Sequence, residues 1–110
     1  MMLLPEQMGE LKAICADARE MSEAGQAYVY LPGLRLPEGS NPAEADGLLS
    51  LQGREGYPTR LFLSQQIVGK GNNWNSFRIL DKTWFACSWN NVSSALRLAE
   101  ILAEHLRAFR

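Results

Sequence analysis

Apolar residues recur every three to four positions along the first part of the chain. The residues that share this spacing are Leu4, Met8, Leu11, Cys15, Ala18 and Met21. This period places them on one face of a helix, and Pro5 stands in a first turn, where proline is tolerated. Gly25 ends the pattern, so the sequence predicts a first helix over about residues 5–23.

The apolar period changes to two after Ala27, which is typical of strands. The predicted strands are 28–31 (broken at Pro32-Gly33 and resumed over 34–36), 47–51, 58–63, 74–80 and 83–89. Turn residues separate them at 37–42, 53–56 and 69–73, and Asp81-Lys82 joins the last two strands as a hairpin. These segments predict four or five antiparallel strands that follow one another as a meander.

The C-terminal segment returns to a helical period after Asn90 and Asn91, and Ser93 or Ser94 can cap the helix. Its apolar stripe consists of Ala95, Leu98, Ala99, Leu102, Leu106 and Phe109. An amphipathic helix of this kind covers one face of a sheet. We therefore expect one α+β domain over residues 1–110, in the order helix, strands, helix.

Composition narrows the function classes. The 110 residues include 11 Lys and Arg against 12 Asp and Glu, a net charge of −1. This balance gives no general attraction to nucleic acid or to an anionic membrane, so we expect neither as a partner. The first residues lack the basic and long apolar segments of a signal peptide, and no apolar run reaches the ~18 residues of a membrane span. We expect a cytoplasmic protein.

Metal and cofactor sites are not expected. The chain has two cysteines, Cys15 and Cys87, and one histidine, His105. A structural zinc site needs about four such ligands, and sparse cysteines suit a reducing cytosol. The Gly69-Lys70-Gly71 run lacks the pattern and the following helix of a phosphate-binding loop, so we predict a turn there.

Cys87 is the candidate nucleophile, with Asn90 and Asn91 as donors to an oxyanion. The alternative is a core cysteine, because strand alternation places Cys87 on the same face as Phe85 and Trp89. The apolar helical neighbours of His105 offer nothing to orient an imidazole. We therefore predict that His105 is a partly exposed residue near a helix C-terminus and not a catalytic base.

Aromatic residues concentrate in the predicted hairpin. Trp74, Trp84 and Trp89 lie there with Phe77 and Phe85, while the nearby cations are few. A platform for single-stranded nucleic acid needs a basic groove beside its aromatics. The pattern therefore favours core packing combined with one exposed tryptophan that binds a protein partner.

Several elements occur in the order found in a known superfamily. They are Leu31-Pro32-Gly33, Leu36-Pro37-Glu38-Gly39, Tyr57-Pro58 ahead of Leu61-Phe62-Leu63, and Trp84-Phe85-Ala86-Cys87-Ser88-Trp89 before a Leu-rich helix that ends at His105-Leu106. This set resembles the divergent prokaryotic members of the ubiquitin-conjugating enzyme superfamily. The His-Pro-Asn element that precedes the cysteine in that superfamily is absent from this chain.

The resemblance implies a ubiquitin-conjugating-enzyme-like (UBC-like) fold and a role in a bacterial ubiquitin-like modification system. Its partners would be a ubiquitin-like protein and the activating enzyme of that protein. Cys87 would carry a thioester, Asn90 or Asn91 would stabilise the oxyanion, and Tyr57 would join the three tryptophans in partner binding. Two alternatives remain open: a non-catalytic adaptor of the same shape that binds through the Trp74–Trp89 hairpin, and a homodimer formed through the stripe of the first helix.

Overall fold

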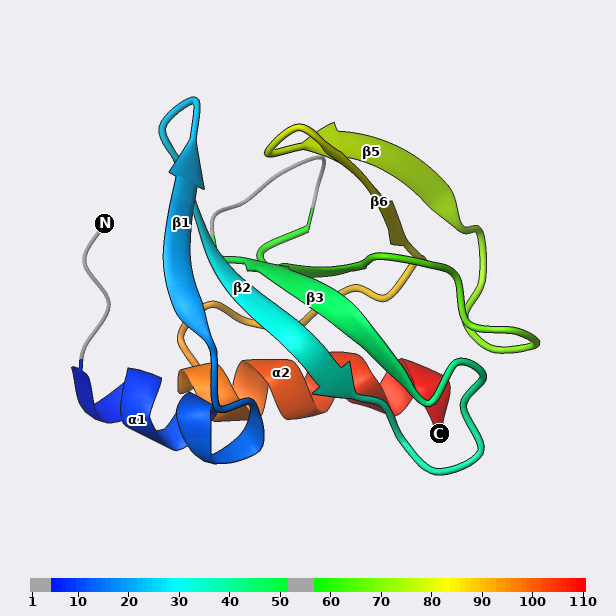
Figure 1. Cartoon of the computed structure of the whole chain (residues 1–110), viewed down its shortest axis with the longest axis horizontal. Coiled ribbons are helices and arrows are strands. Elements are labelled where there is room, and N and C mark those ends of the chain that lie inside the picture. The colour runs from blue at the N-terminus through cyan, green and yellow to red at the C-terminus, as the bar shows by residue number, and fades with distance from the viewer. Residues whose placement is uncertain (1–4, 52–56) are drawn as a thin grey trace.

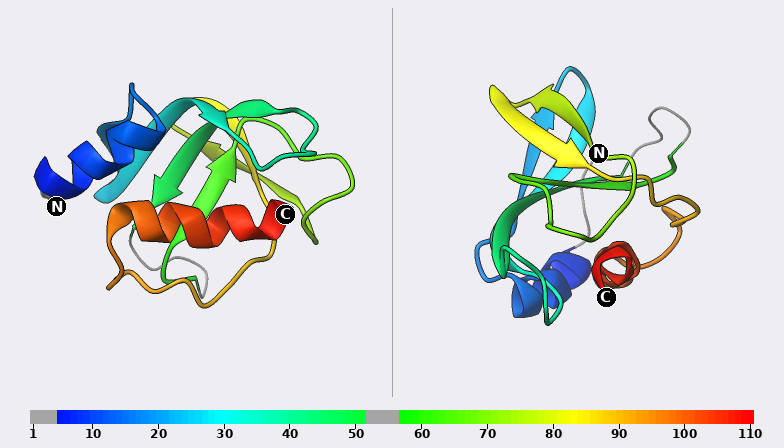
Figure 2. Two further views of the ribbon diagram at one scale, coloured as in Figure 1. Left: turned by 90° about the horizontal axis from the view of Figure 1, so that it is seen from below. Right: turned by 90° about the vertical axis from the view of Figure 1, so that its right-hand side faces the viewer.

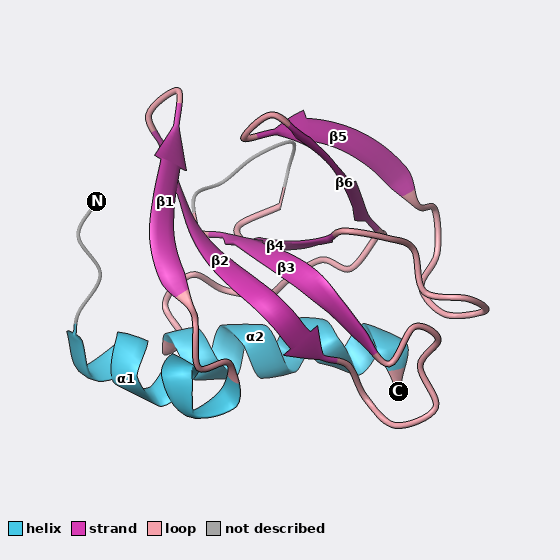
Figure 3. Cartoon of the chain, in the orientation of Figure 1, coloured by secondary structure: helices cyan, strands magenta, loops and turns pink. Residues whose placement is uncertain are grey.

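The computed structural model describes residues 5–51 and 57–110. The elements, drawn in Figures 1 and 3, are α1 (Pro5–Ile14), β1 (Arg19–Glu23), β2 (Gln26–Arg35), β3 (Glu44–Ser50), β4 (Arg60–Leu63), β5 (Asn75–Ile79), β6 (Lys82–Ala86), α2 (Leu98–Leu106) and a 3₁₀ turn, η1 (Arg107–Phe109). The expected α+β class, with a helix near each end of the chain, is confirmed. The turn predicted at 53–56 lies outside the described residues.

The strands form a single antiparallel sheet in the order β1-β2-β3-β4-β6-β5. Two parts of the strand prediction are therefore wrong. The described residues contribute six strands instead of four or five, and the last hairpin is inserted in reverse, so that β6 and not β5 lies beside β4. Leu63 of β4 is the residue that pairs with Phe85 of β6.

The additional strand comes from the segment predicted as the second half of the first helix. Helix α1 ends at Ile14, and the chain turns at Cys15–Ala18 to run back as β1. β1 pairs with β2 from Arg19 opposite Tyr30 to Glu23 opposite Gln26. Ala24 and Gly25 both have positive φ, as a two-residue hairpin turn requires. The segment after Ile14 therefore pairs with β2 as a strand, although its apolar residues keep a helical spacing.

The predicted break at Pro32-Gly33 is a bulge within one continuous strand. The register between β2 and β3 shifts between Leu31 and Leu34. Gly33 adopts a φ of 63° and donates its N–H to Asp46 Oδ1 at 2.9 Å. The bulge keeps Leu31 and Leu34 on the helix-facing side of the sheet.

Helix α2 begins later than the serine cap predicted for it. Ser93 Oγ accepts the Ala95 N–H within a turn, whereas the helix starts after Arg97, whose N–H is accepted by Glu100 Oε1 at 3.1 Å. Residues of α1 complete this helix start, because Gln7 Oε1 accepts the Leu98 N–H at 3.1 Å. Glu10 also accepts two hydrogen bonds from the Arg97 guanidinium, at 2.9 and 3.0 Å.

The curled sheet separates two apolar clusters. The larger cluster lies between the sheet and the helices and includes Leu11, Val29, Leu49, Leu63 and Leu102. The smaller one, here called the concave cluster, lies on the other side and consists of Tyr28, Leu48, Phe62, Ile79, Trp84 and Ala86. Figure 2 shows both helices on one side of the sheet, with the β1–β2 and β5–β6 hairpins rising on the other. A hydrogen bond from the Leu80 N–H to the Glu23 carboxylate joins the two hairpins.

Neither of the two helices has the length and apolar character that crossing a membrane would demand, within residues 5–51 and 57–110.

Candidate functional site

Cys87 follows β6 directly and packs into the cluster between sheet and helices. Only 7% of the residue is exposed. The loop over residues 67–74 covers it: Ser88 N–H donates to Asn72 O at 2.8 Å, and a Cβ built on Gly71 would lie 3.0 Å from Cys87 Cβ. The position is therefore that of a packed core residue.

The electrostatic surroundings of Cys87 favour the neutral thiol. Burial raises the pKa of Cys87 above its usual value, and this effect is larger than the opposing effects of backbone N–H groups and of the Arg60 charge. A nucleophilic cysteine requires the thiolate, which needs a lowered pKa. The thiol is protonated at neutral pH.

Asn90 and Asn91 lie in the exposed loop after β6. Asn91 has a φ of 64° and donates its N–H to Asn90 Oδ1 at 2.7 Å. The Asn90 amide oxygen thus accepts a hydrogen bond from within its own loop. This contact accounts for the two asparagines as residues that fix the backbone of the loop, since Asn tolerates the left-handed region better than most side chains do.

His105 is buried, with 3% of the residue exposed, so the prediction of a partly exposed histidine is wrong. Its Nε2 lies 2.8 Å from Thr59 Oγ1, and the Thr59 hydroxyl donates to Val92 O at 2.8 Å. Because the hydroxyl has one proton, the imidazole must donate from Nε2 to Thr59. Burial, with the nearby Arg60 charge, lowers the pKa of His105 to about 4.

Arg60 is a buried cation that the sequence analysis did not single out. Its guanidinium carbon lies 4.1 Å from the centre of the Tyr57 ring and 4.9 Å from that of Phe77. Its charge acts on the pKa of both Cys87 and His105. Tyr57 is half-buried in this stack. The sequence signal that could have identified Arg60 is its position in a Thr-Arg pair directly before the apolar run Leu61-Phe62-Leu63, where a buried strand begins.

The three tryptophans of the hairpin segment have different positions. Trp84 is 1% exposed and lies in the concave cluster, where its Nε1 donates to Ile79 O at 3.0 Å. It therefore offers no surface to a partner. Trp74 and Trp89 flank the strands and are half-buried against the helix-facing cluster.

Trp74 is fixed against η1, and Trp89 is fixed to the C-terminal part of α2. The Trp74 ring stacks on Phe109 with centroids 5.8 Å apart, and its Nε1 donates to Lys70 O at 2.9 Å. The Lys70 ammonium in turn donates to Phe109 O at 2.7 Å. Trp89 Nε1 donates to Glu104 O at 2.8 Å. We call the half-buried pair Trp74 and Trp89 the tryptophan face.

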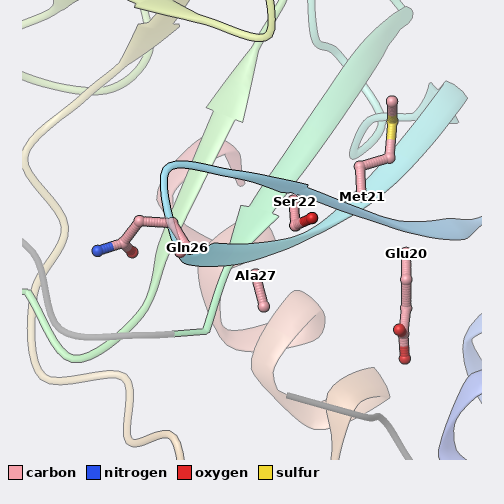
Figure 4. Close-up of a pocket in the computed structure, with 6 residues that line it drawn as sticks. Glu20, Met21, Ser22, Gln26 and Ala27 are labelled. Carbon is pink, nitrogen blue, oxygen red and sulfur yellow. The ribbon is translucent and has the colours of Figure 1, made fainter.

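Hollows occur at the surface of the sheet. One of about 370 Å³ lies along the β1–β2 hairpin and is lined by Glu20, Met21, Ser22, Gly25, Gln26 and Ala27 (Figure 4). Another of about 490 Å³ lies between residues 35–38 and Leu106 with Arg110. Among residues 5–51 and 57–110, no group of three or more His, Cys, Asp or Glu side chains is placed to hold a metal ion.

The structure brings Cys87, Arg60, Thr59 and His105 to one buried region. His105 acts there as a hydrogen-bond donor to Thr59, and Cys87 is a neutral thiol, so the arrangement is that of a packed core. The half-exposed part of the sequence-derived set is the tryptophan face together with Asn90 and Asn91. Comparison of the chain with protein-family models, with curated proteins and with solved structures finds no match.

Proposed function

We propose that this chain is a non-catalytic protein-binding domain that contacts its partner through the tryptophan face. The observation that carries the proposal is the fixed, half-exposed position of Trp74 and Trp89 beside the end of α2. Tryptophan is enriched at binding hot spots because it combines a large apolar area with few rotatable bonds. A ring that is already held in place loses little entropy when a partner binds.

Two further observations support binding over catalysis. Cys87 is covered by the 67–74 loop, and its pKa is raised by burial. The same loop carries Val68, which is 69% exposed and adds apolar surface. Exposed apolar area that joins into one contiguous patch is typical of surfaces that bind other proteins.

The resemblance to the ubiquitin-conjugating enzyme superfamily supplies the class of partner. We propose that the chain has a UBC-like relationship and works in a bacterial ubiquitin-like modification system. Its partners there are a ubiquitin-like protein and the activating enzyme of that protein. The ordered Tyr57-Pro58, Trp84–Trp89 and C-terminal helix elements support this proposal.

Titration calorimetry of the purified chain against such a ubiquitin-like protein and its activating enzyme tests the binding function. We expect Trp74→Ala to weaken binding about tenfold or more, as truncation of a hot-spot tryptophan does. Ser88→Arg places a long charged side chain at the half-buried position next to Trp89 in the chain and should also weaken binding, without removing a core contact. Leu96→Ala, which truncates an exposed apolar side chain outside the tryptophan face, is the matched control. Equal affinities for all four chains would contradict the proposal.

The thioester function is the second candidate, and one observation favours it: the Arg60 charge acts to lower the pKa of Cys87. In that reaction the Cys87 sulfur forms a bond to the acyl carbon as the thioester of the activating enzyme breaks and its thiolate leaves. Incubation with the activating enzyme, ATP and magnesium would then give an adduct that thiols cleave and that Cys87→Ser abolishes. If the activating enzyme carries its thioester and no adduct forms on this chain, the thioester function is excluded and the binding function remains.

A further inference from the structure

Among the strands of residues 5–51 and 57–110, β1 is at the edge of the sheet, since β2 is its one neighbour in the strand order. Figure 1 shows it at the left margin of the sheet, beyond β2. Arg19, Glu20, Ser22 and Glu23 are exposed and Met21 is half-buried. An edge strand offers backbone N–H and C=O groups to a further strand, and its side chains decide which strand is accepted.

Charges of opposite sign lie at the two ends of β1 and on the same face. Arg19, Met21 and Glu23 alternate with Glu20 and Ser22, and Figure 4 shows the Met21 and Glu20 side chains leaving opposite sides of the hairpin. Each of these two charges also has a contact within its own chain. The Arg19 guanidinium carbon lies 5.0 Å from the centre of the Tyr30 ring, and the Glu23 carboxylate accepts the Leu80 N–H.

We propose that two copies of this chain pair through β1, antiparallel and about a two-fold axis at Met21, so that one sheet continues into the other. In this register Arg19 of each copy lies opposite Glu23 of the second copy, and Glu20 lies opposite Ser22. A shift by one residue toward the turn would instead place Glu20 opposite Glu23. The β1 sequence is therefore self-complementary in the centred register and repulsive in the shifted one.

The pairing involves five residues of each copy, which is fewer than the 20–30 a side of a standard interface. The dimer is therefore expected to be weak and concentration-dependent. The two-fold axis places the same charge pair at both ends of the paired strands, so a single substitution changes two contacts at once.

Charge reversal tests the register by sedimentation equilibrium over protein concentrations up to the millimolar range. Arg19→Glu gives two Glu–Glu contacts in a homodimer, and Glu23→Arg gives two Arg–Arg contacts. Each variant alone should dissociate about tenfold more readily than wild type, because like charges opposite one another destabilise paired strands. An equimolar mixture restores both opposite-charge contacts and should dimerise as wild type does. Circular dichroism confirms that each variant is folded.

Cross-linking tests the axis. In the centred register Met21 faces Met21 of the second copy, at a distance within disulfide reach for paired strands, so Met21→Cys should yield a covalent dimer on mild oxidation. Ser22→Cys, which faces Glu20 of the second copy, should yield little. A wild-type chain that is monomeric at every concentration overturns the proposal. The proposal is also overturned if the equimolar mixture of Arg19→Glu and Glu23→Arg does not dimerise, or if the two cysteine variants cross-link equally. None of these results depends on the tryptophan face.

Discussion

Thr59 Oγ1 lies 2.8 Å from His105 Nε2, although 46 positions separate the two residues in the chain. The same hydroxyl donates to Val92 O, so one side chain joins the start of β4, the loop before α2 and α2 itself. Both residues are buried. A neutral imidazole is therefore part of the folded core, and protonation of that imidazole opposes folding.

Acid should destabilise the fold through His105. Its pKa is about 4 in the folded protein against an ordinary value of 6.5, so the unfolded chain binds more protons between these two values. The free energy of unfolding is thus highest above pH 6.5 and falls as the pH drops toward 4, by about 3 kcal/mol from this group. Urea unfolding at a series of pH values measures the slope.

His105→Gln is the control for this slope, because His105 is the only histidine in the chain. The variant should lose the dependence on pH between 5 and 7 that the imidazole causes, whatever its absolute stability. An unchanged slope would show that the folded environment does not lower the pKa of His105.

Removal of the Thr59 hydroxyl should be costly. Thr59→Val keeps the shape of the side chain but leaves the Val92 carbonyl and the His105 N–H without this partner. We expect a loss of about 1–3 kcal/mol in the free energy of unfolding, the cost of an unsatisfied buried polar group. Thr59→Ser retains the hydroxyl and should lose less. Equal losses for the two variants would assign the effect to packing alone.

Neither native thiol should react with an aromatic disulfide reagent at neutral pH. Cys15 and Cys87 are buried, and burial raises the pKa of each thiol. Reaction should follow addition of denaturant, with two thiols modified per chain. Ser88→Cys places a thiol at the half-exposed neighbouring position and should label promptly without denaturant. Labelling of wild type at the rate of that variant would restore Cys87 as a candidate nucleophile.

Gly71→Ala should destabilise the protein more than Gly25→Ala does. Both glycines have positive φ, 76° and 78°, so both substitutions carry a similar backbone cost of about 1–2 kcal/mol. At Gly71 the new methyl group would also lie 3.0 Å from Cys87 Cβ and from Trp74, whereas the space at Gly25 is open. Overpacking adds about 1–3 kcal/mol. Thermal or urea unfolding of the two variants measures the difference, and equal losses would contradict a close cover over Cys87.

Local sequence pattern was sufficient for the elements that carry a clear apolar run or apolar period. The buried strand at Leu61–Leu63 and the Leu-rich final helix lie where the pattern predicts them, with shorter limits. The last hairpin is also present, but its turn lies at Leu80-Asp81 and not at Asp81-Lys82, because Ile79 pairs with Lys82. The different degrees of burial of the three tryptophans could in principle also have been predicted from the sequence. Trp84 lies inside a strand, whereas Trp74 and Trp89 lie beyond the strand ends, where a side chain is only partly enclosed.

Contacts between distant segments decided the rest. Arg19–Glu23 carries no apolar alternation and becomes a strand because the turn at Ala24-Gly25 returns the chain along it. The place of β6 beside β4, and the burial of His105 against Thr59, likewise join segments that are far apart in the sequence. The amino-acid sequence by itself thus determined the periods and turns, because these depend on neighbours within a few residues. Only the tertiary structure decided the strand order, the state of the imidazole and the cover over Cys87, because a hydrogen-bond partner or a covering loop can come from anywhere in the chain.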